Sequence, residues 1–210
     1  MSCDFSSARL RGGSHEHENA CEQDGSRAMS LDPIRLTLPL DRDVIQQLRA
    51  GDSCLLTGPL YTLRDAGHMR LMEEIAQQPQ GADLPYGLNG QTIFYAGPTP
   101  AAAGRPFGAI GPTTSSRMDF AAPALYRAGV AATLGKGKRN QQVHDACVQA
   151  KAVYFVTVGG AAAFLAKCVE SSTTLGYSNL GTEALRRIEV VDFPVFVGID
   201  VLGNDIYERS

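Results

Sequence analysis

A run of hydroxyl side chains followed by an arginine, in the segment GPTTSSRMD (residues 111–119), has the residue types best suited to chemistry. Backbone N–H groups around a tight turn, together with hydroxyls, can donate hydrogen bonds to a carboxylate. Arg117 can bind the same anion through two parallel hydrogen bonds. Two other interpretations stay open: a surface loop, or the start of a helix capped by Thr113 or Thr114. The segment by itself therefore predicts an anion pocket or a local turn.

Two further segments could add charge to such a pocket. Lys136 lies between two glycines in LGKG, where backbone and ammonium group can converge on an anion, although the GxxxxGK[ST] pattern of a P-loop is absent. In RDAGH, Arg64 and His68 are four residues apart, so a helix would place both on one face. These residues suit recognition of a small dicarboxylate with acid–base help. No apparatus for redox chemistry or phosphoryl transfer is evident.

Glycine follows an apolar segment at four points: TGP (57–59), AGP (96–98), IGP (110–112) and VGG (158–160). A strand that ends in glycine lets the backbone approach a ligand closely, and active sites favour such places. Ordinary strand-terminating turns would explain each of the four equally well. The recurrence is therefore compatible with a site or with simple turns.

The elements that must position these residues are strands and helices in mixed order, which predicts an α/β or α+β class. Alternating or continuous apolar patterns predict one strand within each of six segments: 34–40, 53–60, 91–100, 107–116, 129–137 and 152–160. Further strands are expected around a Gly-Asn turn in 183–207. The strand at 53–60 is expected to end at its Gly-Pro turn. Helical spacing and stop signals predict helices in 41–52, 62–78, 124–129, 141–152 and 160–169, the first with Asp41 as N-cap.

The bulk composition fits one globular domain of ordinary make-up. The 210 residues are 44% hydrophobic and 20% charged, with a net charge of −3, which gives no reason to expect a nucleic-acid or membrane partner. Residues 1–29 are polar and aperiodic, so a disordered tail is expected there and a catalytic domain over 30–210. The start of the chain lacks the apolar stretch of a secretory signal, and a cytoplasmic location is expected.

The five cysteines do not indicate a metal site. They are widely spaced, odd in number and without a C-x-x-C pair, which argues against a disulfide framework and against a self-contained zinc or iron–sulfur site. We therefore expect no metal ligands in this chain.

Six motifs occur in an order that resembles a known family: LRDAGH, LNGQTIFYAGPTP, IGPTTSSRMD, LGKG, AVYFVTVGGAAAFLAK and IEVVDFPVFVGIDVLGND. Over roughly residues 34–208 the chain resembles the β component of the iron–sulfur fumarate hydratases and tartrate dehydratases, the C-terminal half of single-chain class I fumarases. The resemblance implies a swivelling β/β/α-type single domain, with a mixed sheet flanked by helices. It also implies a hydro-lyase of the tricarboxylic acid cycle type. Its [4Fe–4S] cluster would be ligated by cysteines of a separate α subunit, in an α2β2-type assembly.

The resemblance also implies roles for individual residues. The arginine and histidine of the family's RD-x-x-H motif fall on Arg64 and His68, with His68 as an acid–base candidate. The first threonine of GPTT falls on Thr113, which the family pattern suggests as a base or substrate ligand. An alcohol needs a neighbour to activate it as a base near neutral pH. The expected substrate ligands are Arg64, Thr114, Ser115, Arg117 and Lys136.

Three functions remain in competition. Reversible hydration of fumarate to (S)-malate is the first expectation, because GPTTSSRMD and the GNDIY ending look more like fumarases. An L(+)-tartrate dehydratase β subunit would differ only in accommodating one more hydroxyl. A non-catalytic subunit that stabilises the cluster-bearing half is disfavoured, because a scaffold needs neither Arg64 nor Lys136.

Overall fold

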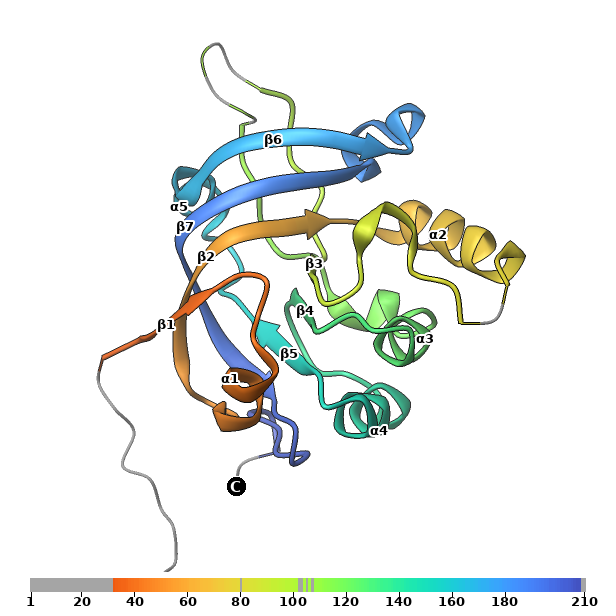
Figure 1. Cartoon of the computed structure of the whole chain (residues 1–210). Helices are drawn as coiled ribbons and strands as arrows, with labels where there is room; N and C mark the ends of the chain where they lie inside the picture. Colours follow the sequence, from red (N-terminus) through yellow and green to blue (C-terminus); the bar gives the residue numbers. More distant parts are fainter. Residues whose placement is uncertain (1–31, 80, 102–103, 105, 107, 209–210) are drawn as a thin grey trace, which may run out of the picture.

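The computed structural model describes residues 32–208, except for 80, 102, 103, 105 and 107. The predicted tail, residues 1–29, lies outside the described residues, so its disorder and the domain boundary at residue 30 stay predictions. Within the described part, the chain is one mixed α/β domain in which a sheet is flanked by helices, as predicted (Figure 1). In this part of the chain no helix combines the length and apolarity that a membrane crossing requires.

The described residues form seven strands, five α-helices and four short 3₁₀ helices. The strands are β1 (Ile34–Thr37), β2 (Ser53–Thr62), β3 (Thr92–Phe94), β4 (Ala132–Gly135), β5 (Val153–Val156), β6 (Val169–Gly176) and β7 (Leu185–Ile199). The α-helices are α1 (Arg42–Gln47), α2 (Asp65–Gln77), α3 (Ala122–Arg127), α4 (Gln141–Ala150) and α5 (Ala162–Leu165). The 3₁₀ helices are η1 (Pro85–Gly87), η2 (Ser115–Met118), η3 (Ala166–Cys168) and η4 (Ser178–Glu183).

The strands close into a ring. Strands β1 to β5 pair side by side and parallel, in the order β1-β2-β3-β4-β5. The long strand β7 pairs antiparallel with both β5 and β2, so that β2, β3, β4, β5 and β7 enclose a core. Strand β6 pairs antiparallel with the first part of β7, residues 185–190, on the edge opposite β2. Because β2 to β5 are parallel, the loops that follow them emerge at the same edge of the sheet.

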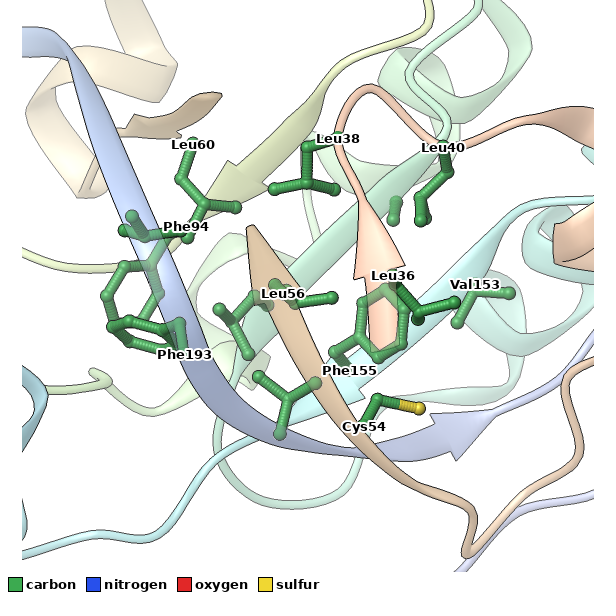
Figure 2. Close-up of a cluster of buried hydrophobic side chains, with 14 of the residues drawn as sticks. Leu36, Leu38, Leu40, Cys54, Leu56, Leu60, Phe94, Val153, Phe155 and Phe193 are labelled. Carbon is green, nitrogen blue, oxygen red and sulfur yellow. The ribbon is translucent and has the colours of Figure 1, made fainter. Parts of the chain in front are cut away.

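Two apolar cores result from the alternation of side chains along these strands. In β5, Val153 and Phe155 point into the ring, whereas Tyr154 and Val156 point toward the helices. Figure 2 shows the inner core, where Phe94 of β3 lies edge-on to Phe193 of β7, with ring centroids 5.5 Å apart. The outer core lies under α2, α3 and α4, which cover the same side of the sheet in Figure 1.

The helices that the periodicity predicts are present, although α1 ends at Gln47, before the expected stop at Gly51, and the helix expected in 160–169 is the short α5 followed by η3. Asp41 caps α1 by accepting a hydrogen bond from the backbone N–H of Asp43 (2.7 Å), as predicted. Asn140 caps α4 in the same way through the N–H of Val143 (2.9 Å). Helix α2 ends two residues before Pro79, as its sequence predicts.

The prediction that the second strand ends at its Gly-Pro turn is wrong. Strand β2 continues through Gly58 and Pro59 to Thr62, with an irregularity in its pairing to β7 between Leu56 and Gly58. Gly58 has φ +121°, and a Cβ there would lie 2.7 Å from the carbonyl oxygen of Leu38. The glycine therefore marks a bulge and a close approach of two strands. Pro59 lies between the part of β2 that pairs with β1 and the part that pairs with β3.

Three other segments differ from their sequence pattern. The strand expected within 107–116 is absent from the residues described there, where two isolated bridges join Pro112 to Ala96 and Thr114 to Lys136. Beyond the Gly203–Asn204 turn the chain makes only one bridge, from Asp205 to Ile199, instead of a strand. Strand β6 has no apolar alternation to predict it, because the five residues from Glu170 to Thr174 are all polar and mostly exposed.

Candidate functional site

The predicted site residues lie at the edge of the sheet where the parallel strands end. Arg64 follows β2, and Lys136 follows β4 directly. Gly97 follows β3, and a Cβ on it would lie 2.7 Å from Cδ of Arg64. Gly159 follows β5, and a Cβ on it would lie 3.8 Å from Nζ of Lys136. Of the four glycines that follow apolar segments, Gly97 therefore makes room for the Arg64 side chain, whereas Gly159 lies at an ordinary contact distance from Lys136.

The GPTT segment lies between the ends of β3 and β4. The backbone N–H of Thr113 donates to the carbonyl oxygen of Tyr95 (2.7 Å), and Thr114 forms a parallel bridge with Lys136. The backbone N–H of Ser115 then donates to the carbonyl oxygen of Lys136 (2.9 Å). Thr113 is half-buried and Thr114 is exposed, so both residues lie near the surface, and Thr114 is paired with Lys136. Neither threonine caps a helix: η2 has Thr114 as its first flanking residue but receives no side-chain hydrogen bond from it.

Ser115 faces the interior, unlike its neighbours. Its side chain is fully buried, and Oγ accepts a hydrogen bond from the backbone N–H of Lys136 (2.9 Å). The hydroxyl of Tyr154 lies 2.9 Å from the same oxygen and donates to the carbonyl oxygen of Gly137 (2.8 Å). A Cβ at Gly135 would overlap Ser115 Oγ and lie 2.9 Å from Cδ2 of Tyr95. Ser115 thus joins the GPTT segment to the Lys136 segment, and in this arrangement its hydroxyl does not face a ligand.

The two arginines belong to a row of alternating charges. Nε of Arg117 lies 2.8 Å from Oδ1 of Asp65, and Oδ2 of Asp65 lies 3.7 Å from Nη2 of Arg64. On the other side of Arg64, Nη2 lies 3.8 Å from Oε1 of Glu183. The Arg117 side chain is half exposed, and its contact with Asp65 is made through Nε.

His68 is placed beneath this row, on the first turn of α2. It is fully buried, its Nδ1 lies 2.9 Å from the carbonyl oxygen of Arg64, and its ring packs edge-on against Tyr95. Because a carbonyl oxygen only accepts, Nδ1 carries the proton and Nε2 is an acceptor without a protein partner. Burial lowers the pKa of His68 to about 4, against the opposing hydrogen bond to Arg64. The ring is therefore neutral at pH 7 and has no exposed surface for a substrate.

A buried ion pair under the site was not predicted from the sequence. Nε of Arg139 lies 2.7 Å from Oδ1 of Asp119, and its guanidinium lies over the rings of Tyr95 (5.3 Å) and Tyr154 (4.9 Å). Oδ2 of Asp119 accepts the backbone N–H of Asn140 (2.9 Å), which ties the end of GPTTSSRMD to the start of α4. No local pattern marks Arg139 as buried; the nearest signal is its position directly before the helix cap.

The described residues do not fit an iron–sulfur cluster. Cys54 lies in the inner core and Cys147 in the outer core, and burial raises the pKa of each thiol to about 12, whereas cluster ligation needs thiolates. Among the residues that the structure describes, no group of three His, Cys, Asp or Glu side chains could hold a metal ion.

A cavity of about 350 Å³ lies outside this row of charges and is lined by residues 98–101, Pro106, Gly181, Thr182 and Arg186. Proline and alanine make up half of this lining, which contains none of the predicted catalytic or substrate residues. The geometry of Thr113, Arg117 and Lys136 is therefore the stronger indication of where a polar ligand binds.

Comparison with known proteins identifies the family of the chain. The profile of the Fumarase C-terminus family matches residues 11–210. The chain is 37% identical to fumarate hydratase 2 of Leishmania major over 181 residues, 84% of this chain and 31% of that protein. It is 40% identical to the anaerobic class I fumarate hydratase of Escherichia coli K12 over 156 residues, 73% of this chain and 28% of that protein. It thus spans about a third or less of these enzymes.

A different relative matches this chain in length. The β subunit of the L(+)-tartrate dehydratase of Escherichia coli K12 is 36% identical over 180 residues, which cover 83% of this chain and 87% of that subunit.

Proposed function

The chain belongs to the Fumarase C-terminus family, and from this premise we propose that it is the β component of a hydro-lyase that interconverts fumarate and (S)-malate. The observation that carries the proposal is the convergence of Arg64, Arg117, Lys136 and the Thr113 hydroxyl at one edge of the sheet. Three cations beside accessible hydroxyls suit a substrate with two carboxylates.

The proposed site is half of an active centre. The fumarate hydratases that the chain resembles are about three times as long as the matched region, and this chain's described residues do not fit a cluster. We expect a separate α subunit to supply the [4Fe–4S] cluster and its cysteine ligands, in an α2β2-type assembly. The cytoplasmic location also remains an expectation.

Binding and orientation are the tasks that this chain's residues can perform. Arg117 and Lys136 would bind the substrate carboxylates, and Arg64 would complete the cationic edge. Thr113 would hold or receive a proton at the reacting carbon. In the described part of the chain, no base is found in hydrogen-bonding contact with its hydroxyl. We expect the activating group to come from the α subunit.

Two predicted residues receive different roles in the proposal. Ser115 would join the Thr113 and Lys136 segments instead of binding substrate, because its hydroxyl is buried and engaged. His68 would hold Arg64 through its carbonyl oxygen instead of exchanging protons with substrate, because it is buried and neutral.

L(+)-tartrate dehydration is the second candidate. It is favoured by the E. coli tartrate dehydratase β subunit, which this chain matches over most of its length. The two reactions differ by one substrate hydroxyl, and the exposed Thr114 is positioned to bind one. A purely stabilising subunit is disfavoured because it would not need three cations at the surface.

The test is reconstitution with the α subunit. The two chains should be co-expressed, purified without oxygen and assayed on fumarate, (S)-malate and both tartrate enantiomers. Hydration of fumarate with little activity on tartrate is the expected result. A complex that holds its cluster but acts on none of these substrates would overturn the proposal.

A further inference from the structure

The N-terminus of α2 lacks a capping side chain of its own. Its N-cap residue is Arg64, which has no hydroxyl, amide or carboxylate to accept a backbone N–H, and it makes no side-chain cap bond. The acceptor comes instead from Glu183 at the end of η4, which lies 117 residues after Ala66. Its Oε2 accepts the backbone N–H of Ala66 at 2.8 Å. A carboxylate at this position is also favoured by the positive end of the helix dipole.

The second oxygen of the same carboxylate faces the Arg64 guanidinium. Oε1 of Glu183 lies 3.8 Å from Nη2 of Arg64, and Asp65 Oδ2 lies 3.7 Å from that nitrogen. Nε of Arg64 is buried and has no protein partner. The direction of the guanidinium is therefore set by two carboxylates, one from its own helix and one from Glu183.

Close backbone packing fixes Glu183 in this place. A Cβ on Gly67 would lie 2.9 Å from the carbonyl oxygen of Glu183. A Cβ on Gly97 would lie 3.1 Å from the carbonyl oxygen of Thr182 and 2.7 Å from Cδ of Arg64. Gly97, three residues after β3, therefore lies close to both the Arg64 side chain and the Thr182 backbone, and the two glycines allow this close packing.

We propose that Glu183 is a positioning residue for Arg64: it caps α2 with one carboxylate oxygen and aims the Arg64 guanidinium at the substrate edge with the other. The inference rests on the proposed function for the role of Arg64, whereas the geometry of the Glu183–Arg64 pair can be tested without it. No sequence motif singles out Glu183, since Arg64 and Ala66, which its carboxylate contacts in the described structure, lie more than a hundred positions earlier.

The decisive experiment is a double-mutant cycle in the assembled enzyme. Glu183→Gln keeps an amide oxygen for the Ala66 N–H and removes the charge that faces Arg64. We expect kcat/KM for the dicarboxylate to fall about tenfold, mostly through KM. Without the Glu183 charge, the Arg64 guanidinium is no longer held toward the substrate, and its charge-assisted contact with a substrate carboxylate is lost. In an Arg64→Gln background the same change should have almost no further effect. Glu189→Gln is the matched control, since it breaks another glutamate–arginine pair, to Arg187 on β7, and should leave kcat/KM unchanged.

A second measurement uses the isolated chain. The arginine Nε–Hε signal that disappears in Arg64→Lys identifies Arg64 by NMR, and its relaxation reports how firmly the side chain is held. Glu183→Gln should make this signal mobile while the melting temperature stays close to wild type; Glu183→Ala should also lower the melting temperature, because the helix cap is lost.

The two readouts separate this inference from the proposed function. Additive effects of Glu183→Gln and Arg64→Gln, or an Arg64 signal that stays rigid in Glu183→Gln, would overturn the positioning role. A wild-type assembly with no hydro-lyase activity would overturn the proposed function. In that case a mobile Arg64 in Glu183→Gln would still support the pairing.

Discussion

Replacing Ser115 by alanine distinguishes a hydroxyl that joins two segments from one that binds substrate. In the wild-type chain, Ser115 Oγ accepts the Lys136 N–H and lies 2.9 Å from the Tyr154 hydroxyl. Alanine leaves the Lys136 N–H without its acceptor, at a cost of about 1–3 kcal/mol for a buried donor, and removes a second bond worth about 1 kcal/mol. Tyr154 keeps the Gly137 carbonyl oxygen as its acceptor.

The isolated chain should therefore lose about 2–4 kcal/mol of unfolding free energy, which corresponds to a melting temperature about 4–16 °C lower for a domain of this size. Ser116→Ala is the control, because the same chemical change falls one residue later on an exposed side chain. Its unfolding free energy should change by less than about 0.5 kcal/mol. Thermal and urea unfolding of the two variants provide the comparison.

The opposite pattern would refute the reasoning. If Ser115 were a substrate ligand, Ser115→Ala would melt like the wild type and raise KM in the assembled enzyme. A variant with unchanged stability in the isolated chain and weaker dicarboxylate binding would restore the sequence-based assignment of Ser115.

Four further outcomes are expected. Thr113→Ala should leave folding nearly unchanged and lower kcat by about two decades in the assembled enzyme, whereas Thr113→Ser should retain part of the activity; an Ala variant that is less stable yet fully active would make the segment a structural turn. Arg117→Lys should lower kcat/KM by about one to two decades, because an ammonium cannot reproduce the guanidinium fork; wild-type kinetics would contradict this. The pKa of His68 in the folded chain, about 4, lies below its unfolded value, so the folded state binds fewer protons between these values and loses stability as the pH falls. Urea unfolding should show a loss of about 2 kcal/mol between pH 7 and pH 5 that is missing in His68→Gln, and equal losses would refute it. Gly135→Ala should lower the melting temperature of the isolated chain, because its Cβ would overlap the buried Ser115 side chain; normal melting would show that the two segments can separate.

Local elements of the fold follow from local sequence, whereas the closure of the sheet does not. The helical spacing and end signals predict α2 and α4, because capping and amphipathicity act over a few residues. The pairing of β2 with β7 joins residues more than a hundred positions apart, and no local pattern encodes it. The sequence around Gly58 predicts a turn for the same reason. A glycine is required there because the backbone of Leu38, directly after β1, lies close to it, and this proximity is set by tertiary packing.

The candidate site also combines features that local sequence predicts with features that depend on distant elements. Residue types and the family resemblance point to Arg64, Arg117 and Lys136, and the structure places all three at one edge of the sheet. Four consecutive hydroxyls look equivalent in the sequence, yet the pairing of Thr114 with Lys136 turns Ser115 inward. The roles of Arg139 and Glu183 depend on partners from distant elements, so neither could be inferred from its neighbours.

The charges at the site indicate why these partners are needed. Arg64 and Arg117 both contact Asp65, and at that separation two guanidinium groups would repel each other if no carboxylate lay between them. Asp65 and Glu183 neutralise two of the three cations, which leaves one net positive charge for a doubly negative substrate. The remaining attraction depends on direction as well as on charge, because the guanidinium groups are held before the ligand arrives and less ordering entropy is lost on binding. Removing either carboxylate would therefore increase the net positive charge and still weaken binding of a dicarboxylate, a result that charge alone would not predict.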